Sequence, residues 1–411
     1  MKTKLSPEFQ GTIEGAAAES ILRKCVHCGF CTATCPTYQL LGDELDGPRG
    51  RIYLIKEVLE GAEPTRSTQQ HLDRCLTCRN CETTCPSGVE YGRLIDIGRN
   101  IVDAKVQRPP GERAARWLLR ESLTSALFKP ALEVGRFSRP FLPAVLRNKI
   151  PDIRSETVRP PPKRSHPRKV MLLAGCVQDA MMPGINRATA HVLDAAGVEV
   201  VLSAGATCCG SVRTHLSDQA GGLENARRNI DAWWPCIQSA RVEAVISNAS
   251  ACGLAIKEYG RALQHDPEYA EKAAAVSGLT RDLSEMLPED IVPALRGKLR
   301  KDLQALVFHP PCTLQHGQRL HGGVEDQLGV LGFEIRTAAS ERHLCCGSAG
   351  TYSVLQPVLA TALRDRKLRN LRASGDEVIV SANLGCIQHL QTGTTGRVSH
   401  WIEILSEAMD A

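Results

Sequence analysis

The chain has 411 residues, 43% of them hydrophobic and 23% charged, which is typical of a soluble globular protein with room for two or three domains. The formal net charge of +5 is too small to favour a nucleic-acid partner, and no apolar run reaches the ~18 residues that span a membrane. The first residues lack the apolar core of a signal peptide, so we expect a cytoplasmic protein whose 17 cysteines are metal ligands or redox groups rather than disulfides.

Residues 1–106 are predicted to form a small, mostly helical, ferredoxin-like domain around two repeated cysteine runs. One helix is expected over Arg51–Glu60 and a second where apolar residues recur between positions 94 and 102. Both runs have the spacing C-x-x-C-x-x-C-x-x-x-C-P, and the second follows the first by fifty residues. Their cysteines are Cys25, Cys28, Cys31 and Cys35, then Cys75, Cys78, Cys81 and Cys85.

This spacing is the one that bacterial ferredoxins use for two [4Fe–4S] clusters, with the fourth cysteine of each run serving the other cluster. Three thiols at this interval lie on one tight loop, and the fourth iron must be reached from elsewhere. Structural zinc is the alternative, but it usually takes separated C-x-x-C pairs, without the third cysteine and the terminal Cys-Pro that recur here. We therefore assign cluster 1 to Cys25, Cys28, Cys31 and Cys85, and cluster 2 to Cys75, Cys78, Cys81 and Cys35.

Residues 107–168 are predicted to be a basic linker that is partly helical and partly proline-rich. Between Lys105 and Lys169 there are sixteen Lys or Arg residues against five Asp or Glu, with apolar residues among them. We expect this segment to dock on anionic lipid headgroups or on an acidic face of a partner subunit. The simpler interpretation is a solvated helical face with ordinary core contacts.

A second duplication gives the rest of the chain two cysteine-rich domains, over residues 169–304 and 305–411. Each has short Val/Ile/Leu-rich runs suited to buried strands, alternating with helical stretches such as Asn186–Ala196 and Pro357–Arg372. This alternation predicts parallel sheets with helical crossovers. The expected fold is therefore multi-domain α+β, with a mostly helical domain followed by two duplicated α/β domains.

Every repeated cysteine of these two domains follows a predicted strand, so the thiols should converge at the carboxyl edge of each sheet. A glycine after each Cys-Cys pair permits the sharp turn that both thiols need to face one site. Three interpretations stay open: a metal or cluster site, a redox-active thiol pair, or buried structural cysteines. The duplication favours a site, made of Cys176, Cys208, Cys209 and Cys252 in the first domain and Cys312, Cys345, Cys346 and Cys386 in the second.

Other residues carry weaker signals. Cys236 has no counterpart in the other domain and is interpreted as a core cysteine. Four histidines lie near the cysteines of the second domain in the sequence: His309, His316, His343 and His389. They could ligate a metal or donate protons, but local hydrogen bonding explains them equally well, and we assign no catalytic residue.

The sequence has no recognisable glycine-rich motif for a flavin or a nucleotide. Iron–sulfur cubanes carry single electrons, whereas the oxidation of a metabolite removes two. A partner that carries a flavin is therefore expected to make the conversion.

The chain resembles the iron–sulfur subunits of bacterial glycolate oxidase (glycolate dehydrogenase) over nearly its whole length. The most specific stretches are CVHCGFCTATCPTYQLLGDELDGPRGRIYLIKEVLEG, HLDRCLTCRNCETTCPSGVEYGRLIDIGR, NIDAWWP and HLCCGSAGTY. More distantly, it is similar to the iron–sulfur subunit of anaerobic glycerol-3-phosphate dehydrogenase and to heterodisulfide reductase subunits. The latter end each half in C-x-x-C, a pattern from which this chain departs at Ala255 and His389.

This resemblance implies an oxidoreductase complex in which FAD-containing subunits oxidise glycolate to glyoxylate, with D-lactate as an alternative substrate. This chain would hold two [4Fe–4S] clusters and no FAD, and would pass electrons towards a membrane quinone from a peripheral position on the inner face of the cell membrane. The alternatives are a subunit of another flavoprotein dehydrogenase, a thiol–disulfide reductase acting at the CCG motifs, and a zinc-stabilised scaffold.

Overall fold

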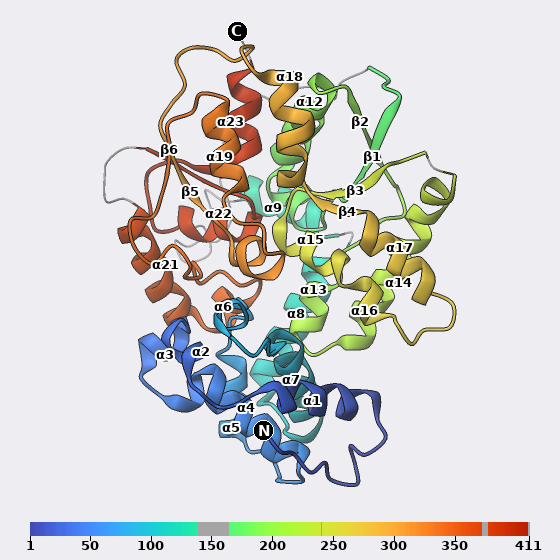
Figure 1. Cartoon of the computed structure of the whole chain (residues 1–411), viewed down its shortest axis with the longest axis vertical. Coiled ribbons are helices and arrows are strands. Elements are labelled where there is room, and N and C mark those ends of the chain that lie inside the picture. The colour runs from blue at the N-terminus through green and yellow to red at the C-terminus, as the bar shows by residue number, and fades with distance from the viewer. Residues whose placement is uncertain (126, 139–163, 240, 372–376, 410–411) are drawn as a thin grey trace.

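The computed structural model describes the whole chain except residues 126, 139–163, 240, 372–376 and 410–411. In Figure 1 a helical N-terminal domain lies at one end, and two α/β halves stand side by side at the other. The sheets of both halves are parallel. The predicted fold class, a mostly helical domain followed by two duplicated α/β domains, is confirmed.

The N-terminal domain is built from short helices that leave the cysteines on the loops between them. The predicted helix over Arg51–Glu60 begins earlier, at Pro48, because proline is favoured in the first helical turn. It packs tightly against the last helix of the domain, where a Cβ on Gly98 would lie 2.5 Å from Ile55 Cγ1. The elements are α1 (Ile13–Lys24), α2 (Phe30–Ala33), α3 (Pro36–Leu41), η1 (Glu44–Asp46), α4 (Pro48–Leu59), α5 (Arg66–Asp73), α6 (Asn80–Thr84) and α7 (Tyr91–Lys105).

The described part of the predicted basic linker begins with two helices, α8 (Pro110–Thr124) and α9 (Phe128–Ser138). Most of the remaining linker lies outside the described residues. Arg108 bonds to Asp73 at 2.6 Å, and Arg116 bonds to the same carboxylate at 2.8 Å. Part of the positive charge of this segment is therefore neutralised within the protein.

Within the described residues, the first α/β half has a four-stranded parallel sheet in the order β2-β1-β3-β4. Val170 of β1 lies opposite Val200 of β2 and Ala244 of β3. The strands are β1 (Arg168–Leu172), β2 (Val198–Leu202), β3 (Ala244–Ser247) and β4 (Thr280–Asp282). The helices are α11 (Gln178–Met181), α12 (Pro183–Ala195), α13 (Ser211–His215), α14 (Gln219–Gln238), α15 (Ser250–Lys257), α16 (Tyr259–Ala262), α17 (Ala270–Leu279), η3 (Leu283–Met286), η4 (Leu287–Ile291) and α18 (Val292–Leu295).

The described residues of the second half repeat this order as β6-β5-β7-β8. Phe308 of β5 lies opposite Thr337 of β6 and Val380 of β7. The strands are β5 (Leu306–His309), β6 (Ile335–Thr337), β7 (Val378–Ser381) and β8 (Val398–His400). The helices are η5 (Thr313–Gly317), α19 (Gly323–Val330), α20 (Tyr352–Leu355), α21 (Pro357–Leu371), α22 (Leu384–Gln391) and α23 (Trp401–Ala408).

The two α/β halves share one hydrophobic core, which runs from Val170 and Ile185 in the first half to Phe308 and Trp401 in the second. Helix α12 packs against α23 across the boundary. The N-terminal domain has a separate core that includes several of its cysteines. Among the described residues, none of the helices combines the length and apolarity needed to cross a bilayer.

Candidate metal centres

The first cysteine group combines three residues of the first run with the last residue of the second run. Cys31 lies among Cys25, Cys85 and Cys28, and burial together with these neighbouring thiols raises the pKa of Cys31 to about 11. A pocket that opens to the surface is lined by all four cysteines. The group therefore has the donor set that a four-iron cluster needs.

The second group has the reciprocal composition. Cys81 lies among Cys78, Cys75 and Cys35, and burial is the main cause that raises the pKa of Cys81 well above its usual value. Because iron binds thiolates, assembly of a cluster here must release the thiol protons. Among the described residues, no three of the eight N-terminal sulfurs lie within 4.8 Å of one another. Such a spread suits a four-iron cube better than a single metal ion.

The loops that carry the two runs have matching backbones. The hydroxyls of Thr34 and Thr84, fifty positions apart, are 3.0 Å from each other where the runs cross. The Asn80 amide also donates to the Thr34 carbonyl at 2.9 Å. Two positions of each run are left-handed: His27 (φ 60°) with Thr77 (φ 52°), and Gly29 (φ 85°) with Arg79 (φ 58°). These turns aim successive thiols at one point in each run.

A buried cation stands beside the second group. The Arg51 side chain is 1% exposed and donates to the His71 carbonyl at 2.7 Å. Its guanidinium lies 3.5 Å from Asp46. Burial lowers the pKa of Arg51, but the charges that Tyr91, Cys75, Cys35 and Asp46 can carry outweigh burial and raise this pKa above its usual value. A cluster with four thiolate ligands is an anion, and Arg51 would offset the charge of such a cluster in the interior.

The thiols of the first α/β half meet at the carboxyl edge of its sheet. The free thiol of Cys208 lies beside those of Cys176 and Cys209, and Cys209 lies in turn beside Cys252. Interaction between these neighbouring thiols raises the pKa of Cys208 and lowers the pKa of Cys209. The turn after the pair requires Gly210, which has φ +92° and whose Cβ would lie 2.7 Å from a backbone carbonyl.

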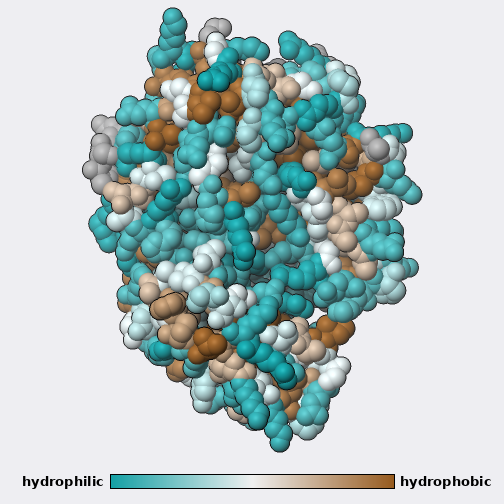
Figure 2. Space-filling view, in the orientation of Figure 1, coloured by the Kyte–Doolittle hydropathy of each residue, from teal (hydrophilic) through white to brown (hydrophobic). Residues whose placement is uncertain are grey.

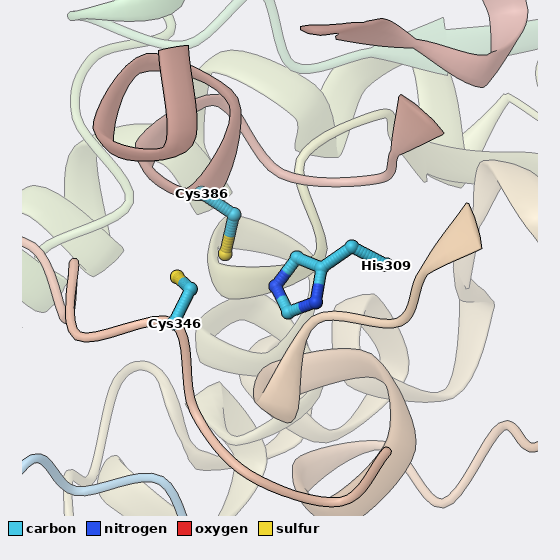
Figure 3. A group of neighbouring side chains, drawn as sticks. All are labelled: His309, Cys346 and Cys386. Atoms are coloured by element: carbon cyan, nitrogen blue, oxygen red, sulfur yellow. The ribbon is translucent and has the colours of Figure 1, made fainter. Parts of the chain in front are cut away.

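The second half repeats this arrangement. The Cys312 and Cys345 sulfurs are 3.9 Å apart. The free thiol of Cys346 lies between those of Cys345 and Cys386. Figure 3 shows the sulfurs of Cys346 and Cys386 close to each other beside the ring of His309, which enters from the end of β5. The structure therefore brings together all four predicted thiols in each half.

The N-terminal domain meets the two halves in different ways. Leu76 and Cys78 of the N-terminal domain pack against Cys312, Cys345 and the Tyr352 ring of the second half. The contact of the N-terminal domain with the first half includes an ion pair instead. The guanidinium of Arg79 donates twice to the Glu258 carboxylate, at 2.6 and 2.9 Å. The second α/β half therefore covers the second cysteine group directly.

The other candidates of the sequence lie outside these groups. His316 bonds to Thr83 at 2.9 Å and to the His343 carbonyl at 2.9 Å, and His389 bonds to the Ala360 carbonyl at 3.0 Å. Local hydrogen bonding thus accounts for His316 and His389. Cys236 is half-buried against the core of the first half, as expected for a core cysteine.

Sequence reasoning missed the buried charges near the thiols. Arg51 interrupts the apolar face of its predicted helix, and this charge among Ile52 and Ile55 was the available signal. Lys367 is 2% exposed and donates to the carbonyls of Glu341 (2.8 Å) and Arg342 (3.3 Å). Its burial lowers its pKa to about 8.

Comparisons with known families and proteins match the regions of the chain that contain these cysteines. A 4Fe–4S dicluster domain matches residues 21–89, and a cysteine-rich domain matches residues 170–257 and 306–391. The glycolate oxidase iron–sulfur subunit of Escherichia coli (strain K12) is 53% identical over 413 residues, which cover 100% of both chains. A probable glycolate oxidase iron–sulfur subunit of Bacillus subtilis (strain 168) is 30% identical, covering 98% of this chain and 97% of its own.

Two further similarities are more remote. Lactate utilization protein A of Bacillus subtilis (strain 168) is 27% identical over 253 residues, which cover 58% of this chain and 99% of that one. A crystal structure of a hypothetical protein from Helicobacter pylori has a TM-score of 0.55 and 12% identity, covering 97% of this chain and 72% of that one. At this identity the solved structure shows a likeness of fold alone.

Proposed function

The chain belongs to the family of glycolate oxidase iron–sulfur subunits, and from this premise we propose that it carries single electrons from flavin-containing partner subunits towards a membrane quinone. The partners oxidise glycolate to glyoxylate, and D-lactate is a second substrate of the same partners. This chain supplies the electron-transfer component of the oxidoreductase complex and no substrate-oxidising residue.

The proposed ligands are the eight N-terminal cysteines in the crossed arrangement. Cluster 1 is held by Cys25, Cys28, Cys31 and Cys85, and cluster 2 by Cys75, Cys78, Cys81 and Cys35. When bound, the clusters supply one-electron redox centres. The chain holds the thiolates in place, excludes water from the second group and balances its charge through Arg51.

The observation that carries this proposal is the crossing of the two runs. Because Cys85 joins the first group and Cys35 joins the second, each run contributes to both clusters. The 3.0 Å contact of Thr34 with Thr84 holds the runs together between them. Two centres built in this way are neighbours, which is what a conducting path requires.

We propose that electrons are exchanged with partner subunits at cluster 1. Cys28 is exposed, whereas Cys78 at the same position of the second run is half-buried against the second α/β half. Val26 and Phe30 are 69% and 61% exposed beside the first group. Figure 2 shows apolar side chains at the surface of the N-terminal domain among hydrophilic ones. Such a surface suits contact with another protein.

A peripheral contact with the inner face of the membrane is proposed for helices α8 and α9. Their exposed apolar residues lie among basic ones, an arrangement suited to the boundary of an anionic bilayer. The exposed set is Trp117 and Leu118 on α8, Leu127 between the helices, and Val134 and Phe137 on α9.

The test is co-expression of this chain with FAD-containing glycolate oxidase subunits, followed by glycolate-dependent reduction of a water-soluble quinone. A Cys78→Ser change should lower the rate at least ~100-fold, because it removes a ligand of cluster 2 and interrupts the path. A Cys236→Ser change, in a core cysteine outside both groups, should leave the rate unchanged. Assays with D-lactate in place of glycolate test the second substrate. Consumption of glycolate by this chain alone would contradict the proposal.

A further inference from the structure

His309 is a buried polar side chain without a partner. It is 1% exposed, and neither ring nitrogen has a hydrogen-bond partner. Leaving such a group unsatisfied costs about 1–3 kcal/mol, so its presence calls for an explanation. The residue three positions before the corresponding cysteine of the first half is Leu173, which is buried and apolar. The fold therefore does not need a polar residue at this place.

The ring of His309 faces two thiols from neighbouring segments of the sheet edge. A ring nitrogen of His309 and the sulfurs of Cys346 and Cys386 all lie within 4.8 Å of one another (Figure 3). They come from the end of β5, from the loop after β6 and from α22 after β7. All three side chains are at least nine-tenths buried.

This spacing fits one tetrahedral metal ion. Bonds of about 2.3 Å to sulfur and about 2.0 Å to nitrogen place the ligand atoms of a zinc ion roughly 3.5–3.8 Å from each other. The 3.9 Å separation of the Cys312 and Cys345 sulfurs shows the same close approach of thiols in this half. The eight N-terminal sulfurs are spread more widely, as described above.

We propose that His309, Cys346 and Cys386 bind a single zinc ion, and that the Cys345 thiol, which lies beside Cys346 but outside the set within 4.8 Å, turns towards the ion as the fourth ligand. Binding converts the thiols to thiolates and releases their protons to solvent. The imidazole binds in its neutral form, and burial already lowers the pKa of His309 well below its usual value. The buried ammonium of Lys367, close to Cys345 and Cys346, offsets the negative charge of the thiolates.

The ion would fix the surface that covers cluster 2. Cys345 packs against Cys78 of the N-terminal domain. A zinc ion would connect the loop that carries Cys345 and Cys346 to the end of β5 and to α22. The described residues of the first half contain no such set, since Leu173 stands where the second half has His309. The neutral amide of Asn229, rather than a buried ammonium, donates to the Cys208 carbonyl. A site of this kind is therefore expected in one half only.

The full chain, purified without oxygen, is analysed for zinc and iron. We expect about one zinc per chain beside the ~8 irons of two four-iron clusters. A Cys386→Ala change should remove the zinc, whereas Cys252→Ala, at the equivalent position of the first half, should retain it. Both variants should keep their iron, which shows that the N-terminal domain has folded. Iron content also tests the proposed function separately from this inference.

Zinc-edge X-ray absorption then identifies the ligands. The wild-type chain should show sulfur at about 2.3 Å together with one nitrogen at about 2.0 Å. A His309→Leu change, which introduces the residue of the first half, should remove the nitrogen signal or the zinc. Iron near ~12 per chain without zinc would assign a third cluster instead and overturn the proposal. Equal zinc in the wild type and in Cys386→Ala would overturn it as well.

Discussion

The two cysteine runs share a sequence pattern and a backbone, yet their surroundings are opposite. Val26 is 69% exposed, whereas Leu76, fifty positions later, is 5% exposed. Phe30 is 61% exposed, whereas the corresponding Asn80 is 2% exposed and bonds to the first run. The repeated sequence thus determines the backbone that positions the thiols. Contact with the second α/β half determines which of the two cysteine groups solvent and partner proteins can reach.

This difference gives the proposed electron path an open end and a closed end. The second α/β half covers the Cys78 group through Cys312, Cys345 and Tyr352. Nothing in the described residues of either α/β half is packed on Phe30 in the same way, and its side chain stays at the surface. Exposure of a cluster favours exchange with partners, and cover protects the other cluster from water and oxygen.

The largest expected effect is on the closed end. Leu76→Ala removes a buried side chain between Cys78 and the second half, which should lower the free energy of unfolding by about 2–4 kcal/mol. Oxygen should then bleach cluster 2 faster. Denaturant unfolding under argon and the loss of visible absorption in air measure the two effects.

The matched control is Val26→Ala at the same position of the first run. Because Val26 is largely exposed, its truncation should change the free energy of unfolding by less than ~0.5 kcal/mol. If Val26→Ala and Leu76→Ala lowered the free energy of unfolding equally, the two cysteine runs would not differ in how far the rest of the protein buries them.

A smaller effect is expected at the open end. Phe30→Asp places a charge on the surface beside Cys31 and should lower partner-dependent electron transfer about tenfold, which corresponds to ~1.4 kcal/mol. Iron content should not change, because residue 30 is not a proposed ligand. Quinone reduction with the flavin subunits is the measurement.

Val358→Asp is the control for this variant, since Val358 is 80% exposed on α21 of the second half. It should leave the rate unchanged. If both substitutions lower the rate alike, or if Phe30→Asp has no effect, electrons are exchanged at another surface.

The smallest effect is expected from a single hydrogen bond across the cover. The Tyr352 hydroxyl donates to the Arg74 carbonyl at 3.1 Å, next to Cys75. Tyr352→Phe should lower the free energy of unfolding by about 1 kcal/mol while keeping both clusters. Tyr53→Phe, at a side chain 44% exposed, should have no measurable effect in the same denaturant titration. If Tyr352→Phe were as stable as the wild type, the hydrogen bond from Tyr352 to the Arg74 carbonyl would not stabilise the contact between the domains.

Much of the fold follows from local signals in the sequence. The apolar stripe of Arg51–Glu60 predicted α4, and the stretch Pro357–Arg372 predicted α21 almost to its ends. Strand-like runs followed by cysteines predicted that thiols would gather at the edge of each parallel sheet. These predictions depend on spacing along the chain, which a duplicated sequence displays twice.

The rest depended on contacts between distant segments. A charge at Arg51 could be read as a solvated residue until its burial beside Asp46 was known. His309 could be a capped core histidine until both ring nitrogens proved to lack partners. Nothing in the spacing of the runs indicates that Leu76, but not Val26, meets another domain. These features depend on tertiary packing, which the periodicity of a sequence does not reveal.

The central claim is that eight crossed cysteines hold two neighbouring four-iron clusters. Electron paramagnetic resonance of the full chain, reduced without oxygen and paired with iron analysis, tests it most directly. The account predicts ~8 irons per chain and two reduced clusters whose spins interact because the runs cross. A single isolated spin with ~4 irons per chain, or two spins with no interaction, would contradict it.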